Sequence, residues 1–368
     1  MENILMFFLL IMLVPFFILS IFMPFWTRKT ESFGVTIPEE VFHHPKLQTM
    51  RNKYARYTTI LSIIGIAAFM LLGLTATTEE ATSIYFAVIV VSFLIINFII
   101  YLKFHKEMKT FKEQENWAKE KTQHVFVDIR FRQNKLTYSY GWFIIPILVT
   151  VGLIIITFQN YQRIPELIPM QYNFEGEVTN WATKSYRSVL ILPIMTIYQN
   201  LLFIFINIII AQAKQQINPD NPEESIRKNV IFRRRWSAFS IVSSFALTLL
   251  FSVIQLSFIY STNERIITIV SLVVTAFILL AALFLAVTTG QGGSRVKGVN
   301  STTDTTINRD DDRYWKLGQF YFNKNDPSLF LEKRFGVGWT INCARPLVWI
   351  ILIAIIGLFI GIPQFLGM

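Results

Sequence analysis

Two apolar runs decide the fold of this chain: residues 141–159, GWFIIPILVTVGLIIITFQ, and residues 187–211, RSVLILPIMTIYQNLLFIFINIIIA. Each is about as long as a helix that crosses the ~30 Å hydrocarbon core of a membrane. Similar runs on both sides bring the predicted spans to eight: 3–26, 56–75, 83–103, 141–159, 187–211, 237–260, 266–288 and 346–366. A segment in lipid must satisfy its own backbone hydrogen bonds, which favours helices. We therefore predict an all-α polytopic membrane protein, a bundle of about eight transmembrane helices with small cytosolic β-hairpin elements.

The composition agrees with a membrane protein. Of 368 residues, 53% are hydrophobic and 16% are charged, whereas about a quarter are charged in soluble domains. The single cysteine, Cys343, excludes an internal disulfide and a cysteine-rich metal site. The first run is expected to be a retained helix rather than a cleaved signal peptide. No basic region precedes it, and the bulky residues 23–26 stand where a cleavage site needs small ones.

The positions of the basic residues predict the topology. The net charge of +10 is compatible with binding to nucleic acid or to an anionic membrane surface. However, 30 of the 34 lysines and arginines fall in four segments: 27–55 with Arg56, 103–140, 212–236 and 289–345. Cytoplasmic loops carry such an excess. We predict a multi-pass protein of the cell membrane with both termini extracytoplasmic, and a lipid bilayer rather than nucleic acid as its surroundings. The external segments then carry a net charge of −3.

Three cytoplasmic elements are expected before the C-terminal part. Residues 104–124 are helix-forming and highly charged, and should extend the third span into solvent. Residues 125–140 alternate apolar and polar side chains, which predicts a small hairpin. Residues 289–312 are rich in Gly, Ser, Thr and Asp and predict a flexible linker. Its GQGG stretch lacks the preceding strand and the Gly-Lys-Ser/Thr ending of a phosphate-binding loop.

An aromatic unit occupies residues 313–345. Its segments 320–322 and 329–331 predict two short strands around a polar turn. The unit is either a plug beneath the bundle, which we favour because aromatic residues beside a membrane are commonly anchors, or a docking surface for a cytosolic protein. The chain is thereby divided into an N-terminal membrane region (1–140), a central membrane domain (141–288) with an external loop (160–186), the linker (289–312) and a C-terminal part (313–368).

The polar insert at residues 164–185, IPELIPMQYNFEGEVTNWATKS, is where specific chemistry is expected to face the outside. Proline fixes φ, and Asn and Gly permit tight turns, so a shaped loop is predicted. A plain connector between two helices would need only a few residues. We therefore interpret the loop as ligand-binding, with these candidate residues: Pro165, Pro169, Gln171, Asn173, Gly176 and Trp181.

A second candidate site lies within the spans. Polar side chains fall on one helical face of the fifth and sixth spans. This polar stripe comprises Gln199, Asn200, Asn207 and Gln255, with Thr196, Ser237, Ser240, Ser244 and Thr248 beside them. Such residues face the interior of a bundle or a wet cavity, because an unpaired amide in hydrocarbon is costly. We favour hydrogen bonding between helices over a lined pathway, since no acidic or basic residue lies within the spans away from their end residues.

The sequence carries no motif for catalysis or metal binding. It has no HExxH, no Gly-x-Ser-x-Gly and no aspartate pair within a span. His43 and His44, with Glu39 and Glu40 nearby, come closest to a metal site, but adjacent ligands rarely converge on one ion. We predict no catalytic residue, no metal and no cofactor, and a protein that is not an enzyme.

Two patterns carry a family resemblance. The first consists of Ile164-Pro165, Ile168-Pro169, Asn173, Gly176 and Trp181-Ala182-Thr183-Lys184. It resembles the extracytoplasmic signature of an uncharacterised bacterial membrane domain shared with the Sdp-type toxin-immunity proteins. The second consists of Tyr314–Gly318, Tyr321–Asn323, Asp326-Pro327, Lys333-Arg334 and Gly336–Asn342. It resembles an uncharacterised domain often found at the C-terminal end of such proteins.

Position 171 departs from the first pattern. Relatives commonly have histidine there, whereas Gln171 neither titrates near pH 7 nor ligates zinc well, which puts a pH-sensing or metal role in doubt. The resemblance implies a bacterial resistance, sensing or signalling protein. We expect immunity or resistance, sensing or signalling through the external loop, with a peptide toxin or envelope component as ligand and a cytosolic protein as a further partner. The alternative is a permease for a small molecule or peptide.

Overall fold

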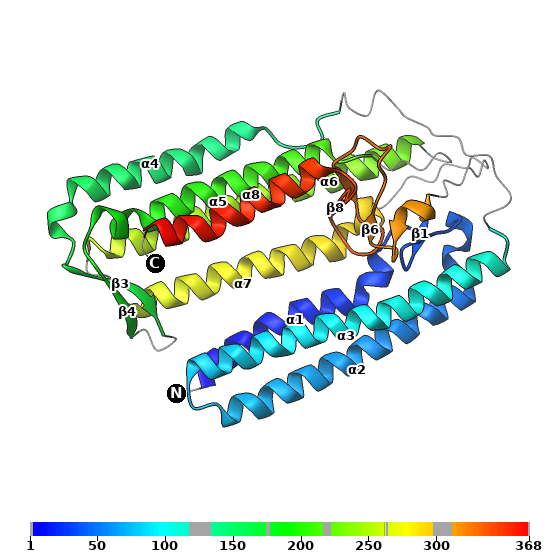
Figure 1. Cartoon of the computed structure of the whole chain (residues 1–368), viewed down its shortest axis with the longest axis horizontal. Helices are drawn as coiled ribbons and strands as arrows, with labels where there is room; N and C mark the ends of the chain where they lie inside the picture. The colour runs from blue at the N-terminus through cyan, green and yellow to red at the C-terminus, as the bar shows by residue number, and fades with distance from the viewer. Residues whose placement is uncertain are drawn as a thin grey trace.

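The computed structural model describes residues 3–117, 134–173, 177–215, 222–260, 262, 264–296 and 311–366. Within them, eight long helices run nearly parallel along the long axis of the molecule (Figure 1). These are α1 (Asn3–Trp26), α2 (Pro45–Thr75), α3 (Glu79–Gln114), α4 (Ile144–Gln159), α5 (Tyr186–Gln212), α6 (Pro222–Ser257), α7 (Glu264–Thr289) and α8 (Pro346–Leu366). Short 3₁₀ turns are η1 (Glu39–His43), η3 (Tyr140–Phe143), η4 (Tyr161–Arg163), η5 (Gln291–Gly293) and η6 (Asp312–Tyr314).

The prediction of an all-α polytopic membrane protein is confirmed. In the described part of the chain, seven helices are long and apolar enough to cross a membrane. The eighth, α8, has a shorter apolar stretch at Pro346–Gly361. Large apolar side chains such as Leu71, Phe284 and Ile353 are more than 60% exposed. Helices that are apolar all round are typical of spans whose outer faces meet lipid.

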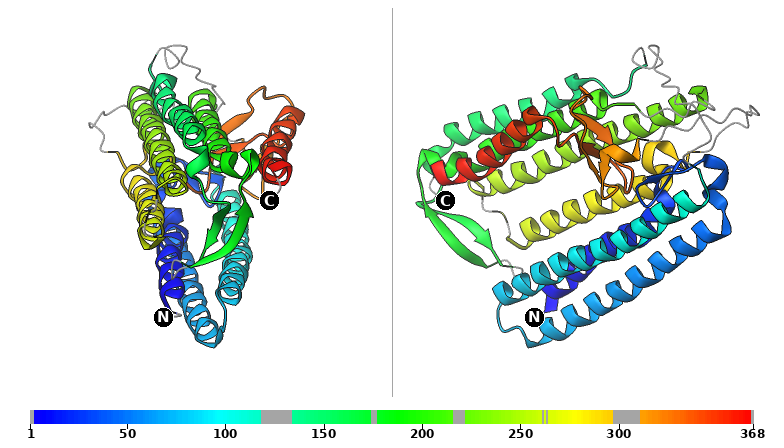
Figure 2. Two further views of the ribbon diagram at one scale, coloured as in Figure 1. Left: turned by 90° about the vertical axis from the view of Figure 1, so that its left-hand side faces the viewer. Right: turned by 45° about the vertical axis from the view of Figure 1, so that its right-hand side comes forward.

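The helices form two groups that α7 joins. Helices α1, α2 and α3 pack together, and so do α4, α5 and α6, with α8 against α5. Between the groups, α7 contacts α1 on one side and α6 on the other (Figure 2). The N-terminal group therefore meets the rest of the molecule through α7 and through the elements at one end of the bundle.

The two ends of the bundle carry different elements. Both termini lie at the end that carries the hairpin of β3 (Leu167–Tyr172) and β4 (Val178–Thr183) (Figure 1). The opposite end carries β1 (Glu31–Ser32), β2 (Val35–Thr36), β5 (Trp315–Lys316), β6 (Phe320–Tyr321), β7 (Phe330–Glu332) and β8 (Trp339–Ile341). The predicted alternation of segments between two ends is thus present. That the β3–β4 end faces the outside stays a prediction from the charge distribution.

A labelling experiment tests this orientation. With Cys343 replaced by serine, Glu177→Cys is expected to react with a membrane-impermeant thiol reagent in intact cells. Lys316→Cys is expected to react only after the membrane is permeabilised, because these two exposed residues lie at opposite ends of the bundle. The reverse pattern in intact cells would invert the orientation.

The predicted hairpin at residues 125–140 differs from the structure. Its first arm lies outside the described residues, and its second arm is not a strand, since residues 134–139 have no regular structure. The backbone N–H of Tyr138 donates to Ser237 Oγ at 3.0 Å, and the carbonyl of Tyr138 accepts from Asn207 Nδ2 at 3.5 Å. Backbone groups that bond to helix side chains are not available for a strand partner.

The predicted strands at 320–322 and 329–331 are present as β6 and β7, but they do not pair with each other. β6 pairs with β5, and β7 pairs with β8, both antiparallel. Positive φ angles at Leu317-Gly318 and at Gly336 and Gly338 reverse the chain before β6 and after β7. The two predicted strands therefore belong to two different hairpins.

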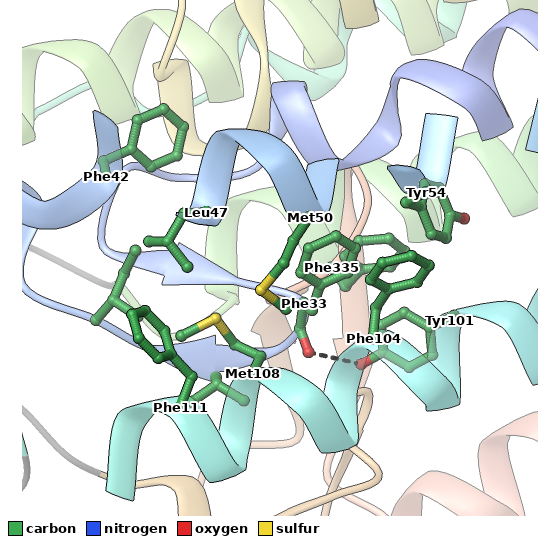
Figure 3. Close-up of a cluster of buried hydrophobic side chains, with 12 residues drawn as sticks. Phe33, Phe42, Leu47, Met50, Tyr54, Tyr101, Phe104, Met108, Phe111 and Phe335 are labelled. Atoms are coloured by element: carbon green, nitrogen blue, oxygen red, sulfur yellow. Dashed lines mark hydrogen bonds between the residues drawn. The ribbon is translucent and has the colours of Figure 1, made fainter. Parts of the chain in front are cut away.

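The largest described core cluster, drawn in Figure 3, lies around the β1–β2 turn. This turn is at the end of the bundle opposite the termini (Figure 1). Apolar side chains from α2, α3 and the β1–β2 turn form it, and Phe335 from the C-terminal part completes it. The ring of Phe335 lies 4.5 Å from that of Tyr101 and 5.9 Å from that of Phe33, measured between centroids. Phe335 thus anchors the aromatic unit to the N-terminal group, and the roles of plug and docking surface both stay predictions.

Candidate functional site

The external loop is a two-stranded hairpin. Leu167 lies opposite Thr183, and Pro169 lies opposite Trp181, with a β-bulge directly after Pro169. The bulge has a local reason, because proline has no N–H to donate to the ladder. Residues directly opposite each other project from the same face of a sheet. These four side chains therefore share one face, and Ile168 is on the other.

The inner face fixes the hairpin to the bundle. Ile168 is fully buried in a cluster with Ile164, Val189 of α5 and Phe258. Only two residues separate β4 from α5, and a capping box closes the start of that helix. The hairpin therefore cannot move freely with respect to α5.

The outer face presents apolar side chains to the surroundings. Trp181 is 51% exposed and Leu167 is 55% exposed. Ile168, which follows Leu167 and points to the other face, is buried, so the strand geometry directs Leu167 and its face-mate Trp181 outward. Exposed apolar groups on a polar loop mark either an interaction surface or a contact with the membrane interface.

The predicted loop residues have different roles. Pro169 and Trp181 form one cross-strand pair, and Gln171 is exposed further along β3. Pro165 is exposed before β3. Asn173 instead shapes the turn, because its Oδ1 accepts from the backbone N–H of Glu177 at 2.7 Å. Gly176 lies outside the described residues.

The polar stripe forms a hydrogen-bonded seam between α5 and α6, with α4 at one end. Its four members are all buried. Asn200 Nδ2 donates to Thr248 Oγ1 at 3.1 Å, and Asn200 Oδ1 accepts from Ser244 Oγ. Gln255 Nε2 donates to Thr157 Oγ1 of α4 at 3.2 Å and to the carbonyl of Val189 at 3.1 Å.

Three amide oxygens of this seam have no hydrogen-bond partner: Gln199 Oε1, Asn207 Oδ1 and Gln255 Oε1. Their orientation is fixed, because each amide nitrogen donates to a backbone carbonyl, which can only accept. Asn207 and Gln199 are eight residues apart on α5, or about 12 Å. The unpaired acceptors therefore lie at different depths in the bundle.

Sequence reasoning missed a buried charged site at the opposite end. Arg233 of α6 is fully buried and donates to Glu332 Oε1 of β7 at 2.9 Å. It also donates to the carbonyls of Ile210 and Ala213 at the end of α5, as a cation at a helix C-terminus does. Glu332 pairs with Arg28 as well, so this carboxylate links β7 to α6 and to the segment directly after α1, and Arg233 links it to the end of α5.

A second ionic cluster lies beside the first. Asp312 pairs with Arg334 and with Lys112 of α3, the latter at 2.7 Å. Thr36 of β2 donates its N–H and hydroxyl to Asp312 Oδ1 at 3.1 and 2.9 Å. Burial alone would raise the pKa of Asp312, but Arg334 and Lys112 hold it at about 2. We refer to both clusters together as the junction: Arg28, Lys112, Arg233, Asp311, Asp312, Glu332 and Arg334.

Helix α5 connects the hairpin to the C-terminal unit. The backbone N–H of Lys214, just after α5, donates to the carbonyl of Phe330 at 2.9 Å, and its ammonium pairs with Asp326. Burial would raise the pKa of Asp326, but bonds from Lys214 and Ser328 bring it to about 2. Helix α5 is therefore the direct connection between the β3–β4 hairpin at one end of the bundle and the C-terminal unit at the other.

The described residues contain no group of three or more His, Cys, Asp or Glu side chains that could hold a metal ion. Residues 147–197 match a domain of unknown function (DUF1648), and residues 324–349 match a family of unknown function (DUF5808). No curated protein and no solved structure matches the chain. The first match contains the hairpin and the beginning of α5. The second contains β7, β8 and two junction residues, Glu332 and Arg334.

Proposed function

We propose that this multi-pass membrane protein recognises a cationic amphipathic peptide outside the cell and serves in immunity or sensing. The observation that carries the proposal is the outward apolar face of the β3–β4 hairpin, held by a buried inner face. The resemblance of the loop to Sdp-type immunity proteins supports the same class of ligand and a bacterial plasma membrane.

The free edge of β4 supports an extended peptide as the ligand. Among the described strands, β3 and β4 pair only with each other, so each has one open edge. Natural edge strands are protected by Pro, charge or bulges. β3 has Pro169 and a bulge, whereas β4, VTNWAT, has no proline and no charge. An open strand edge accepts a peptide as an added strand, with pockets or side chains giving specificity.

The charge of the external end supports a cationic ligand. The external segments carry a net charge of −3. Glu79 and Glu80 at the start of α3, and Glu166 and Glu177 beside the hairpin, are all exposed. Opposite charge attracts and orients a partner more than it adds affinity. The apolar face would then supply most of the binding free energy.

A resistance assay tests the proposal. Cells that lack the gene are expected to be more sensitive to a panel of cationic amphipathic peptides. Trp181→Ala should fail to restore resistance, because truncating a central aromatic residue costs about 2 kcal/mol or more of binding, or roughly thirty-fold in affinity. Trp142→Ala is the matched control, since Trp142 is 53% exposed at the opposite end. Unchanged sensitivity and unchanged transcription in the deletion strain would refute a recognition role.

A permease is the second candidate, and the unpaired amide oxygens of the seam favour it. A polar solute or water that moves along α5 would supply the missing donors. The same resistance assay distinguishes a permease from a recognition protein. If the protein is a permease, simultaneous substitution of leucine for Gln199, Asn200 and Asn207 is expected to abolish its function. A recognition protein that folds normally with this replacement keeps its function and loses it with Trp181→Ala.

A further inference from the structure

The inference concerns Glu31, a buried carboxyl group at the edge of the junction. Glu31 is in β1 and is 5% exposed, and its Oε2 has no hydrogen-bond partner. An unpaired carboxylate in a protein interior is costly to ionise. Ionisation of Glu31 would therefore weaken the packing of the β1–β2 turn against the C-terminal unit.

Glu31 lies where the N-terminal group meets the C-terminal unit. Thr36, which is opposite Glu31 in the β1–β2 ladder, is bonded to Asp312. Arg334 donates to the carbonyl of Gly34 in the same turn at 3.2 Å. The β1–β2 turn is thus held by two residues from the other end of the chain, and Glu31 is adjacent to both contacts.

Charged groups of both signs surround Glu31. Arg28 precedes it, and Arg334, Asp311 and Asp312 face it from the C-terminal unit. On the 3₁₀ turn η1, the acidic side chains are exposed and point to solvent. From α3, Lys112 reaches Asp312, and His105 Nδ1 is 2.8 Å from the carbonyl of Phe33.

Burial raises the pKa of Glu31 to about 7 from an ordinary value of 4.5. Arg28 and Arg334 oppose this rise, and Asp311 and Asp312 add to it. A carboxyl group whose pKa is higher in the closed state than in the open state favours closure at low pH. Its contribution to closure is complete below pH 4.5, falls between 4.5 and 7, and is lost above that range.

We propose that Glu31 is a proton-operated latch of the junction. The protonated carboxyl group keeps the β1–β2 turn closed on the C-terminal unit. When the proton leaves to solvent, the carboxylate requires hydration, and the turn releases Asp312 and Arg334. The charge distribution predicts that the junction faces the cytosol. The latch would then open and close in response to the pH of the cytosol.

Hydrogen exchange of the Thr36 amide tests the latch, because this N–H must leave Asp312 in order to exchange. The full chain in lipid nanodiscs is measured at pH 6 and pH 8, with rates corrected for intrinsic exchange. The two pKa values above predict that the opening equilibrium rises about tenfold between these pH values. Asp312, with its pKa at about 2, stays ionised throughout.

Three variants separate Glu31 from its neighbours. Glu31→Gln is expected to stay closed with no pH dependence, because the amide cannot ionise. Glu39→Gln, on an exposed position of the same segment, should keep the tenfold change. His105→Gln should keep it too, which matters because histidine titrates in the same pH range. Flat exchange in the native protein, or a tenfold change that survives Glu31→Gln or disappears with His105→Gln, overturns the proposal.

Discussion

Replacing Glu332 with alanine is expected to lower the free energy of unfolding by about 3–5 kcal/mol, the loss that follows when a buried ion pair loses one partner. Glu332 is completely buried and neutralises Arg233, which is buried as well, and Arg28. The alanine variant leaves two guanidinium groups without their carboxylate in a dry environment. Thermal or denaturant unfolding of the protein in detergent micelles measures the effect.

Glu39→Ala is the control for this prediction. Glu39 pairs with Lys29 at 3.7 Å, and both side chains are more than 40% exposed. Such a surface pair contributes less than about 1 kcal/mol. Exchanging Arg28, Arg233 and Glu332 together for apolar residues should recover part of the loss, because no unpaired charge of this triad then remains buried. If Glu332→Ala and Glu39→Ala unfold alike, the junction does not stabilise the fold.

Replacing Gly34 with alanine is expected to lower the free energy of unfolding by about 2–5 kcal/mol, from strain of a side chain at positive φ and from overpacking. Gly34 has φ +76°, and an added Cβ would lie 2.5 Å from Tyr101 Oη and 2.7 Å from Gly318 Cα. Since part of this contact is backbone, a rotamer change cannot relieve it. The β1–β2 turn would have to retreat from the β5–β6 turn.

Gly152→Ala is the matched control for Gly34→Ala. Gly152 lies in α4, and nothing lies within 4 Å of an added Cβ. Alanine is the better helix former, so this variant should be neutral or more stable by about 0.5–1 kcal/mol. The same unfolding experiment compares the two variants. Equal stabilities would show that the two turns do not pack as closely as described.

The sequence predicted the membrane helices from the length of the apolar runs, and the seam from the helical periodicity of its polar residues. Asn200 falls on the same helical face as Gln199, and that geometry alone implied a buried neighbour, which proved to be Thr248 and Ser244 of α6. The strand pairing of the external loop was not predicted. Pro165 and Pro169 were interpreted as residues that fix the shape of a loop, whereas Pro169 lies within a strand beside a bulge.

The junction could not be predicted from local patterns. Arg334 and Gly34 are 300 residues apart in the chain, and nothing in either segment specifies the other. A weak signal existed at Glu332, an acidic residue directly after the apolar pair Phe330-Leu331. Its burial depends on Arg233, which sequence reasoning counted only among the basic residues of a cytoplasmic segment. Charge counting therefore grouped these residues at one end of the bundle and missed their pairing.

Phe335 completes a core that otherwise belongs to the first third of the chain. Ribosomes make proteins from the N-terminus, so α1, α2 and α3 enter the membrane long before Phe335 exists. Until then, the rings of Phe33, Tyr54 and Tyr101 lack the ring of Phe335, which contacts all three in the complete fold. A chain that stops early would leave this aromatic surface open to chaperones and proteases. The core of the first third of the chain is thus complete only after residue 335 has been made.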